Sequence, residues 1–245
     1  MKRHEMIHSP AIGRSIHLWC YGHWGLPVIA FPTAAGFAHE WERQMMVQNL
    51  AHLIGSGRIK LYTPESTVSQ CLTNKTDPPD LRVRRLMAYE DFVMNQLVPF
   101  IRHDCQSAQI PIGLAGASLG GYYAANYALK HPQTFDYALC MSGRYLLTHF
   151  TGGFSNGDVY FNNPLAYAAN MAGECLDVVR AHTHVSLVCG QGPYEEGCIE
   201  ETIMLADMLQ AKGIPHTRDI WGKDTAHDWT SWRRQSLIHL TQRYG

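Results

Sequence analysis

A serine framed by glycines is the residue best suited to nucleophilic chemistry in this chain. Residues 116–121 read Gly-Ala-Ser-Leu-Gly-Gly, so Ser118 has a glycine two positions before it and another two positions after it. This Gly-x-Ser-x-Gly pattern is typical of a nucleophile elbow, a tight strand-to-helix turn that needs small residues so that strand and helix can approach closely. The apolar run 110–116 and the helix-like segment 119–129 flank it. The pattern predicts a nucleophile at Ser118; the alternative is an inert serine in a glycine-rich turn.

A nucleophilic serine needs a base, and His227 has the position expected of one. The chain contains 14 histidines, so position is more informative than residue type. His227 follows the strand-like run 216–221 and precedes the helix-like segment 229–244. By contrast, His216 begins that strand and His239 falls inside that helix. We therefore predict that His227 accepts the serine proton.

A carboxylate must orient the imidazole, and two adjacent glutamates are the candidates. Glu195 and Glu196 follow the strand-like run 185–189, which gives the order serine, acid, histidine along the chain. Asp224 lies three residues before the histidine and is more typical of a turn residue. Asp228 directly precedes a helix and is expected to cap it. The residues alone leave Glu195 and Glu196 both open.

Strand-like runs alternate with helix-like segments along the whole chain, which indicates an α/β fold. We expect strands at 2–9, 14–21, 27–31, 59–62, 110–116, 135–141, 185–189 and 216–221, and helices at 41–54, 81–103, 119–129, 200–211 and 229–244. The first two strands should form a hairpin, and the rest a mainly parallel sheet with right-handed crossovers. Catalytic groups should then gather at the carboxyl ends of the strands. Residues 63–80 are expected to form a loop, and the weakly periodic segment 143–182 could cover a site.

Composition excludes several classes of protein. The 245 residues suit a single domain, 1–245, and 46% hydrophobic with 17% charged residues is typical of a globular fold. A net charge of −1 gives no field for binding nucleic acid or an anionic membrane. The chain shows neither a signal-peptide pattern nor an apolar run long enough to span a membrane. Seven cysteines without a Cys-x-x-Cys pair favour a reducing compartment, so we expect a cytoplasmic protein.

The motifs together resemble the putative-esterase family of α/β-hydrolases. This family includes esterase D-type S-formylglutathione hydrolases, feruloyl esterases, enterochelin esterases and mycobacterial mycolyltransferases. The resemblance covers nearly the whole chain and is carried by residues 116–121, 159–164, 190–196, 220–222 and 227–229. It implies an α/β-hydrolase fold with an eight-stranded, mostly parallel sheet and helices on both faces.

The resemblance also implies a catalytic triad of Ser118, Glu195 and His227. Backbone N–H groups of Leu119 and of Thr33 or Ala34 would form the oxyanion hole, and no metal or cofactor would be used. The expected activity is hydrolysis of a small-molecule carboxylic ester or thioester through an acyl-enzyme. Two alternatives remain open: an acyltransferase with the same triad, and a non-catalytic binding protein on a hydrolase fold.

Two histidine pairs offer a rival metal hypothesis. Residues 4–8 read His-Glu-Met-Ile-His, the zinc-protease pattern, which requires a helix to bring both histidines to one ion. We expect a strand there, in which positions four apart are separated by about 13 Å. His182 and His184 lie at the start of a strand without a third ligand nearby. Neither pair is therefore expected to bind a metal.

Overall fold

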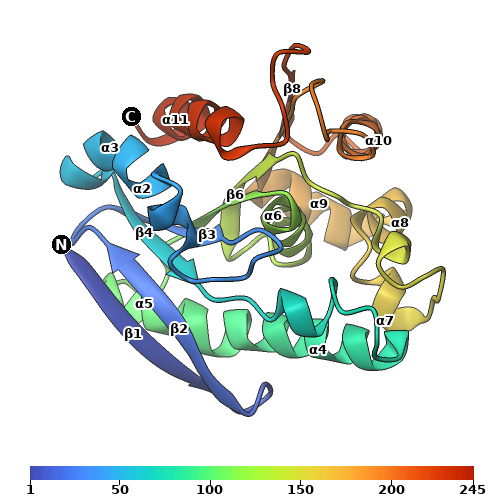
Figure 1. Cartoon of the computed structure of the whole chain (residues 1–245), viewed down its shortest axis with the longest axis horizontal. Coiled ribbons are helices and arrows are strands. Elements are labelled where there is room, and N and C mark those ends of the chain that lie inside the picture. Colours follow the sequence, from blue (N-terminus) through green and yellow to red (C-terminus); the bar gives the residue numbers. More distant parts are fainter.

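The fold centres on one eight-stranded β-sheet, and the computed structural model describes all residues from 1 to 245 (Figure 1). The strands are β1 (Lys2–Ser9), β2 (Arg14–Tyr21), β3 (Leu26–Phe31), β4 (Ile59–Pro64), β5 (Ile112–Ala117), β6 (Phe135–Met141), β7 (His184–Cys189) and β8 (His216–Ile220). Their order across the sheet is β1-β2-β4-β3-β5-β6-β7-β8. The β1–β2 and β2–β4 pairs are antiparallel and all remaining pairs are parallel. The predicted α/β-hydrolase fold is confirmed.

Alternate residues of the strands contribute to two hydrophobic clusters, one on each face of the sheet. In β3, Val28 and Ala30 belong to a cluster of 18 buried residues, whereas Ile29 and Phe31 belong to a cluster of 44. Successive side chains of a strand point to opposite faces, so a strand covered on both sides must be apolar throughout. This requirement explains the unbroken apolar run in the sequence of β3.

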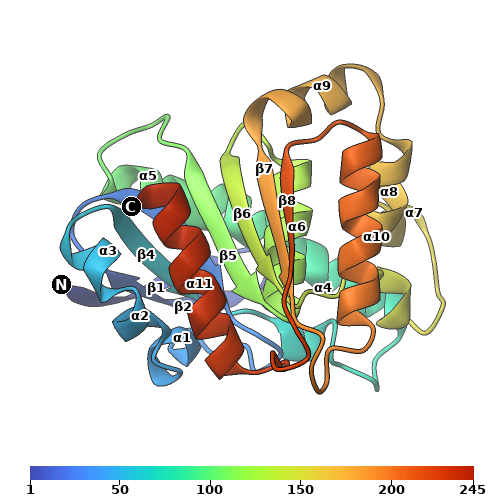
Figure 2. The same cartoon turned by 90° about the horizontal axis from the view of Figure 1, so that it is seen from above.

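Helices cover both faces, as predicted. The smaller cluster is covered by α1 (Glu40–Arg43), α2 (Met46–Asn49), α3 (Ala51–Gly55) and α11 (Trp229–Tyr244). The larger cluster is covered by α4 (Pro79–Phe92), α5 (Val98–Asp104), α6 (Leu119–Lys130), α7 (Gly157–Tyr160), α8 (Pro164–Asn170), α9 (Gly173–His182) and α10 (Cys198–Ala211). Figure 2 shows α10 and α11 flanking the last strands of the sheet. None of these helices has the length and apolar character needed to cross a membrane.

The single helix predicted at 41–54 is wrong, because three short helices, α1 to α3, occupy this region. The first break falls at Met45, whose φ of 63° lies in the left-handed region that a right-handed helix cannot include. Neither glycine nor proline marks this position in the sequence. The periodic apolar residues that suggested one helix, such as Trp41 and Leu53, are nevertheless buried against the sheet.

The long helix predicted at 81–103 is a nearly continuous helical segment from Pro79 to Asp104, with an irregularity inside it. Residues Val93–Leu97 form a π-helical turn between α4 and α5. Pro99 lies two residues after this turn, as the second residue of α5. A proline inside a helix has no N–H to donate and its ring crowds the carbonyl four residues earlier, so a wider turn just before it relieves both problems.

Element boundaries differ from the prediction in two further regions. The strand predicted at 110–116 begins at Ile112, after Pro111, and ends at Ala117. The weakly periodic segment 143–182, in which no helix was predicted, contains α7, α8, α9 and a short 3₁₀ turn. It joins the carboxyl end of β6 to the amino end of β7, so its first residues lie at the edge where catalytic groups are expected. Its middle also packs on α6, because the Tyr122 hydroxyl donates to the Asn162 carbonyl over 2.7 Å.

Candidate active site

The carboxyl ends of β5 to β8 lie side by side and carry the residues singled out from the sequence. In the sheet register Ala117 pairs with Met141, and Met141 pairs with Val188. Cys189 pairs with Ile220 on the last strand. The segments that follow these strand ends contain Ser118, Ser142, Glu195 and His227, respectively. Four loops distant in sequence therefore meet at one edge of the sheet.

Ser118 occupies a strained turn between β5 and α6. Its φ of 56° and ψ of −122° lie outside the regions that L residues favour. A Cβ atom on Gly116 would lie 2.2 Å from the backbone carbon and oxygen of Gly120, and a Cβ atom on Gly120 would lie 2.7 Å from the Phe31 carbonyl oxygen. Both glycines are therefore sterically required. The arrangement is that of a nucleophile elbow, with the serine side chain only partly buried.

Glu195 and His227 form a hydrogen-bonded pair. The His227 Nδ1 atom lies 3.1 Å from Glu195 Oε2, and the glutamate is only 1% exposed. Two glycines allow this contact, because a Cβ atom on Gly190 or Gly192 would lie 2.1 Å or 2.6 Å from the Thr225 carbonyl oxygen. The loop that follows β7 can thus pack closely against the loop that carries the histidine.

The other carboxylates considered from the sequence lie elsewhere. Glu196 is exposed to solvent and Asp224 is exposed on its turn. Asp228 accepts a hydrogen bond from the Ser231 amide over 2.8 Å, which confirms the prediction that it caps α11. Glu195 is therefore the carboxylate in contact with His227, in agreement with the choice that the family resemblance implied.

Ser142 and Trp232 extend this pair into a chain of hydrogen bonds that sequence reasoning missed. The Ser142 hydroxyl lies 2.6 Å from Glu195 Oε1, and the indole nitrogen of Trp232 lies 3.0 Å from the same hydroxyl oxygen. The Trp232 ring also packs edge-on against the imidazole of His227, with ring centroids 4.9 Å apart. The one signal for Ser142 in the sequence is its position directly after a predicted strand. The sequence allows Trp232 either to line a pocket or to pack in the core, and core packing is the more typical role of an aromatic at helical spacing.

Ser118 and His227 are not joined by a direct hydrogen bond in this structure, although they lie on the same edge. Such catalytic hydrogen bonds are often long before substrate binds and shorten in the reacting complex. His227 keeps 19% of its side chain exposed, and its Nδ1 atom is occupied by Glu195. The Nε2 atom is therefore the one left to exchange a proton with another group.

Two backbone amides have the location expected of an oxyanion hole. Leu119 is the first residue of α6, so its N–H has no acceptor within the helix. After β3, the Thr33 N–H is already engaged, because it donates to Glu40 Oε2 over 2.6 Å. The next amide, that of Ala34, donates to no protein group. Of the two candidates that the sequence left open on this loop, Ala34 is thus the one with a free donor.

The metal hypotheses find no support in the arrangement of ligands. His4 and His8 lie on β1, as predicted, rather than on a helix. One group of possible ligand atoms does gather within 4.8 Å, formed by Glu195, Cys198 and His227. Burial and the nearby Glu195 carboxylate raise the pKa of the Cys198 thiol to about 12. The hydrogen bond between Glu195 and His227 accounts for the closeness of these groups.

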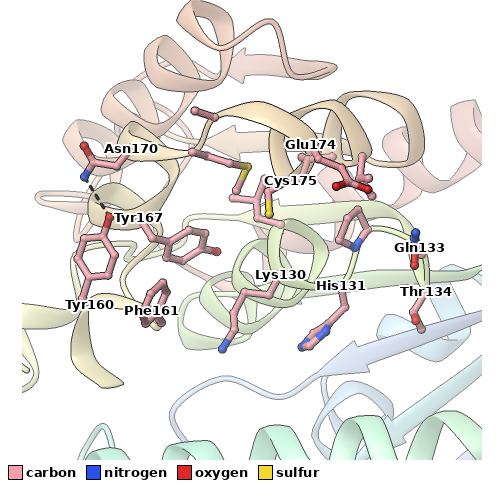
Figure 3. Close-up of a pocket in the computed structure, with 16 residues that line it drawn as sticks. Lys130, His131, Gln133, Thr134, Tyr160, Phe161, Tyr167, Asn170, Glu174 and Cys175 are labelled. Atoms are coloured by element: carbon pink, nitrogen blue, oxygen red, sulfur yellow. Dashed lines mark hydrogen bonds between the residues drawn. The ribbon is translucent and has the colours of Figure 1, made fainter. Parts of the chain in front are cut away.

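A separate hollow of about 730 Å³ lies at the opposite end of α6 (Figure 3). It is lined by the last turn of that helix together with α8 and α9, including Lys130, Tyr167 and Cys175. Ser118 precedes the first residue of the 12-residue helix, and a helix of this length spans about 18 Å. The hollow is therefore distinct from the edge that carries Ser118.

Comparison with known proteins agrees with this fold. A ferulic acid esterase superposes with a TM-score of 0.76 at 17% identity, over 100% of this chain and 98% of the other. The S-formylglutathione hydrolase of Agrobacterium tumefaciens gives a TM-score of 0.75 at 14% identity, over 100% and 96% of the two chains. MPT51 (FbpC1) of Mycobacterium tuberculosis gives 0.71 at 17% identity, over 99% and 97%. At these identities the likeness establishes the fold alone.

The sequence itself identifies the family. A comparison with curated protein sequences finds no match. The profile of the family described as Putative esterase, however, matches residues 82–243, which include Ser118, Glu195 and His227. The matched region runs from α4 almost to the end of α11 and covers well over half of the chain. The chain therefore belongs to the Putative esterase family and has the α/β-hydrolase fold.

Proposed function

We propose that this protein is a serine esterase that hydrolyses small carboxylic esters or thioesters through an acyl-enzyme. The observation that carries the proposal is the strained turn at Ser118, which stands at the same sheet edge as the hydrogen-bonded pair of His227 and the buried Glu195. Backbone strain of this kind is costly and persists mainly where function requires it. Family membership supports the same chemistry.

In the first half of the reaction, Ser118 Oγ attacks the carbonyl carbon of the ester while His227 Nε2 accepts the hydroxyl proton. The carbonyl oxygen becomes an oxyanion that accepts hydrogen bonds from the Leu119 and Ala34 amides. The tetrahedral intermediate then collapses and the bond to the leaving group breaks. The leaving alcohol or thiol takes the proton from His227, and the acyl group remains on Ser118.

In the second half, water replaces the alcohol. His227 takes a proton from water, the resulting hydroxide attacks the acyl carbon, and the bond to Ser118 breaks as the serine recovers its proton. Throughout, Glu195 holds the imidazole with Nε2 directed outward and stabilises the imidazolium charge that forms twice in each cycle. The hydrogen bond from Ser142 compensates this carboxylate for its loss of hydration.

A panel of p-nitrophenyl esters with acyl chains of increasing length tests the proposal. We expect the wild-type protein to hydrolyse at least the short esters with a burst of p-nitrophenol, and Ser118→Ala to lose nearly all turnover. Ser107→Ala is a matched control, because Ser107 lies beyond α5 at the amino-terminal side of β5. Absence of hydrolysis across the whole panel, with correctly folded protein, would contradict the proposal. Added alcohol acceptors would reveal acyl transfer as new ester products instead of acid.

A further inference from the structure

Glu40 is a buried carboxylate that the reaction described above does not use. It lies at the start of α1, is only 6% exposed and takes part in no salt bridge. Acidic side chains are almost never fully buried unless a cation or a metal pairs with them, because the charge loses its hydration. A glutamate kept at such a position calls for a local explanation.

Both carboxylate oxygens of Glu40 bind the same residue, Thr33. The Thr33 amide donates to Oε2 over 2.6 Å, and the Thr33 hydroxyl donates to Oε1 over 2.8 Å. The two contacts hold the backbone and the side chain of Thr33 at once. On the other side of Thr33, the Gly36 amide donates to the Thr33 carbonyl over 3.1 Å, and this carbonyl shares a peptide plane with the Ala34 N–H. Glu40 and Gly36 thus hold Thr33 from both sides of the backbone that leads to the Ala34 amide.

The loop after β3, which contains Thr33 and Ala34, contacts the elbow on one side and the chain after β4 on the other. A Cβ atom on Gly120 would lie 2.8 Å from the Pro32 carbonyl oxygen, so the chain just before Thr33 touches the first turn of α6. On the other side, the Ser66 amide donates to the Gly36 carbonyl over 2.9 Å. Between these two anchors Ala34 is exposed to solvent. Within this exposed stretch, the side chain of Glu40 restrains Thr33, the residue that precedes Ala34.

We propose that Glu40 is a positioning residue of the oxyanion hole: by clamping Thr33 it presents the Ala34 amide to the reacting carbonyl oxygen. This inference rests on the proposed esterase function and adds a residue to it. Glu40 does not touch the substrate. It acts through Thr33, and its effect should therefore fall on the step that develops the oxyanion rather than on substrate binding.

The chemistry of Glu40 agrees with this role. Burial raises the pKa of the Glu40 carboxyl, and the hydrogen bonds from Thr33 oppose that rise. The neighbouring basic residues, His39 and Arg43, act on it only through space. The clamp itself does not require a negative charge, because a glutamine amide could accept the Thr33 N–H and donate to the Thr33 hydroxyl. An isosteric apolar residue could do neither.

The test compares Glu40→Leu, Glu40→Gln and Thr33→Val with the matched control Glu42→Leu. This control changes a half-buried glutamate of the same helix that pairs with Lys2 and does not contact Thr33. For each variant kcat and KM are measured with a short p-nitrophenyl ester. Inhibition by a trifluoromethyl ketone of matched acyl length is measured alongside, because its serine adduct carries an oxyanion. We expect Glu40→Leu to lower kcat by about 10- to 100-fold while KM stays within threefold of wild type. The affinity for the ketone should fall by a similar factor. Glu40→Gln and Glu42→Leu should stay within about threefold of wild type.

Three outcomes would overturn the inference. One is a Glu40→Leu variant with kcat within twofold of wild type, and a second is a loss of kcat with unchanged affinity for the ketone. If Glu40→Leu does not fold, Thr33→Val takes its place as the test. The third overturning outcome is a Thr33→Val variant with the same activity as wild type. A wild-type protein that neither hydrolyses esters nor binds the ketone would contradict the proposed function itself, and this inference with it.

Discussion

Trp232 donates its indole N–H to the hydroxyl oxygen of Ser142 over 3.0 Å, and this contact determines the direction of the Ser142 proton. An indole nitrogen can only donate, so the hydroxyl oxygen must accept there. The Ser142 proton is then free to point at Glu195, whose Oε1 atom lies 2.6 Å away. A residue on α11 thereby helps to orient the carboxylate that holds the imidazole.

Removing this chain of hydrogen bonds should slow the reaction in a non-additive way. Ser142→Ala leaves Glu195 Oε1 with only a long contact of 3.4 Å to the Gly190 amide, and we expect kcat to fall about 10-fold. Trp232→Phe keeps an aromatic ring beside His227 but loses the N–H, so a fall of about threefold is expected. The double variant should be no slower than Ser142→Ala, because the indole acts through that hydroxyl. A double variant whose fall in kcat equals the product of the two single falls would contradict this account. Ser236→Ala, which changes a buried serine on α11, is the control.

The adjacent glutamates provide an internal comparison. Glu195→Gln should lower kcat by up to about 10⁴-fold with little change in stability, because the amide cannot stabilise an imidazolium ion. Glu196→Gln should remain within about twofold of wild type, since that side chain faces solvent. Steady-state kinetics and melting temperatures measured on both variants test the assignment. A severe loss of kcat confined to Glu196→Gln would show that Glu196 is the acid of the triad.

The elbow glycines should tolerate no side chain. In Gly116→Ala the new methyl group would lie 2.2 Å from the backbone of Gly120, which cannot move away without displacing α6. We expect a loss of about 3 kcal/mol or more in the free energy of unfolding, measured by urea denaturation. Gly157→Ala is the matched control, because nothing lies within 4 Å of its new methyl group and it should change stability by less than about 1 kcal/mol. Equal stability of both variants would show that the turn is less constrained than described.

Glu90 should make the stability of the fold depend on pH in acid. Burial alone would raise the pKa of the Glu90 carboxyl, but the hydrogen bond from His131 and the ion pair with Lys130 outweigh burial and lower it. A carboxyl whose pKa is lower in the folded state stabilises the fold above its ordinary pKa, and this contribution is lost as pH falls through the lowered value. Glu90→Gln should therefore lose stability at neutral pH and show a weaker decline in acid. Urea denaturation between pH 3 and 7 would measure this, with exposed Glu174→Gln as control. Parallel pH curves for wild type and Glu90→Gln would contradict it.

Much of the fold could be predicted because its elements carry strong local patterns. The strand Phe135–Met141 and the helix Trp229–Tyr244 have the predicted bounds, since an apolar run and a helix cap mark them in the sequence. The break at Met45 carries no such mark, because a methionine stands where the left-handed backbone would favour glycine. Local pattern cannot reveal a constraint that arises from tertiary contacts.

The same distinction applies to the candidate site. Ser118 was predictable because its strained turn requires two glycines at fixed spacing. Ser142 and Glu40 were not, because each acts through a partner more than five positions away, Glu195 in one case and Thr33 in the other. Their residue types are common and their neighbours give no motif. The sequence therefore predicts the reacting groups better than the groups that orient them.

Covalent labelling of the wild-type protein by a fluorophosphonate, followed by peptide mass spectrometry, tests the central claim most directly. Only an activated serine reacts rapidly with such a probe. We predict one adduct per chain, located on Ser118, and no adduct in Ser118→Ala. Rapid labelling that persists in Ser118→Ala, or a folded wild-type protein that remains unlabelled, would contradict the account.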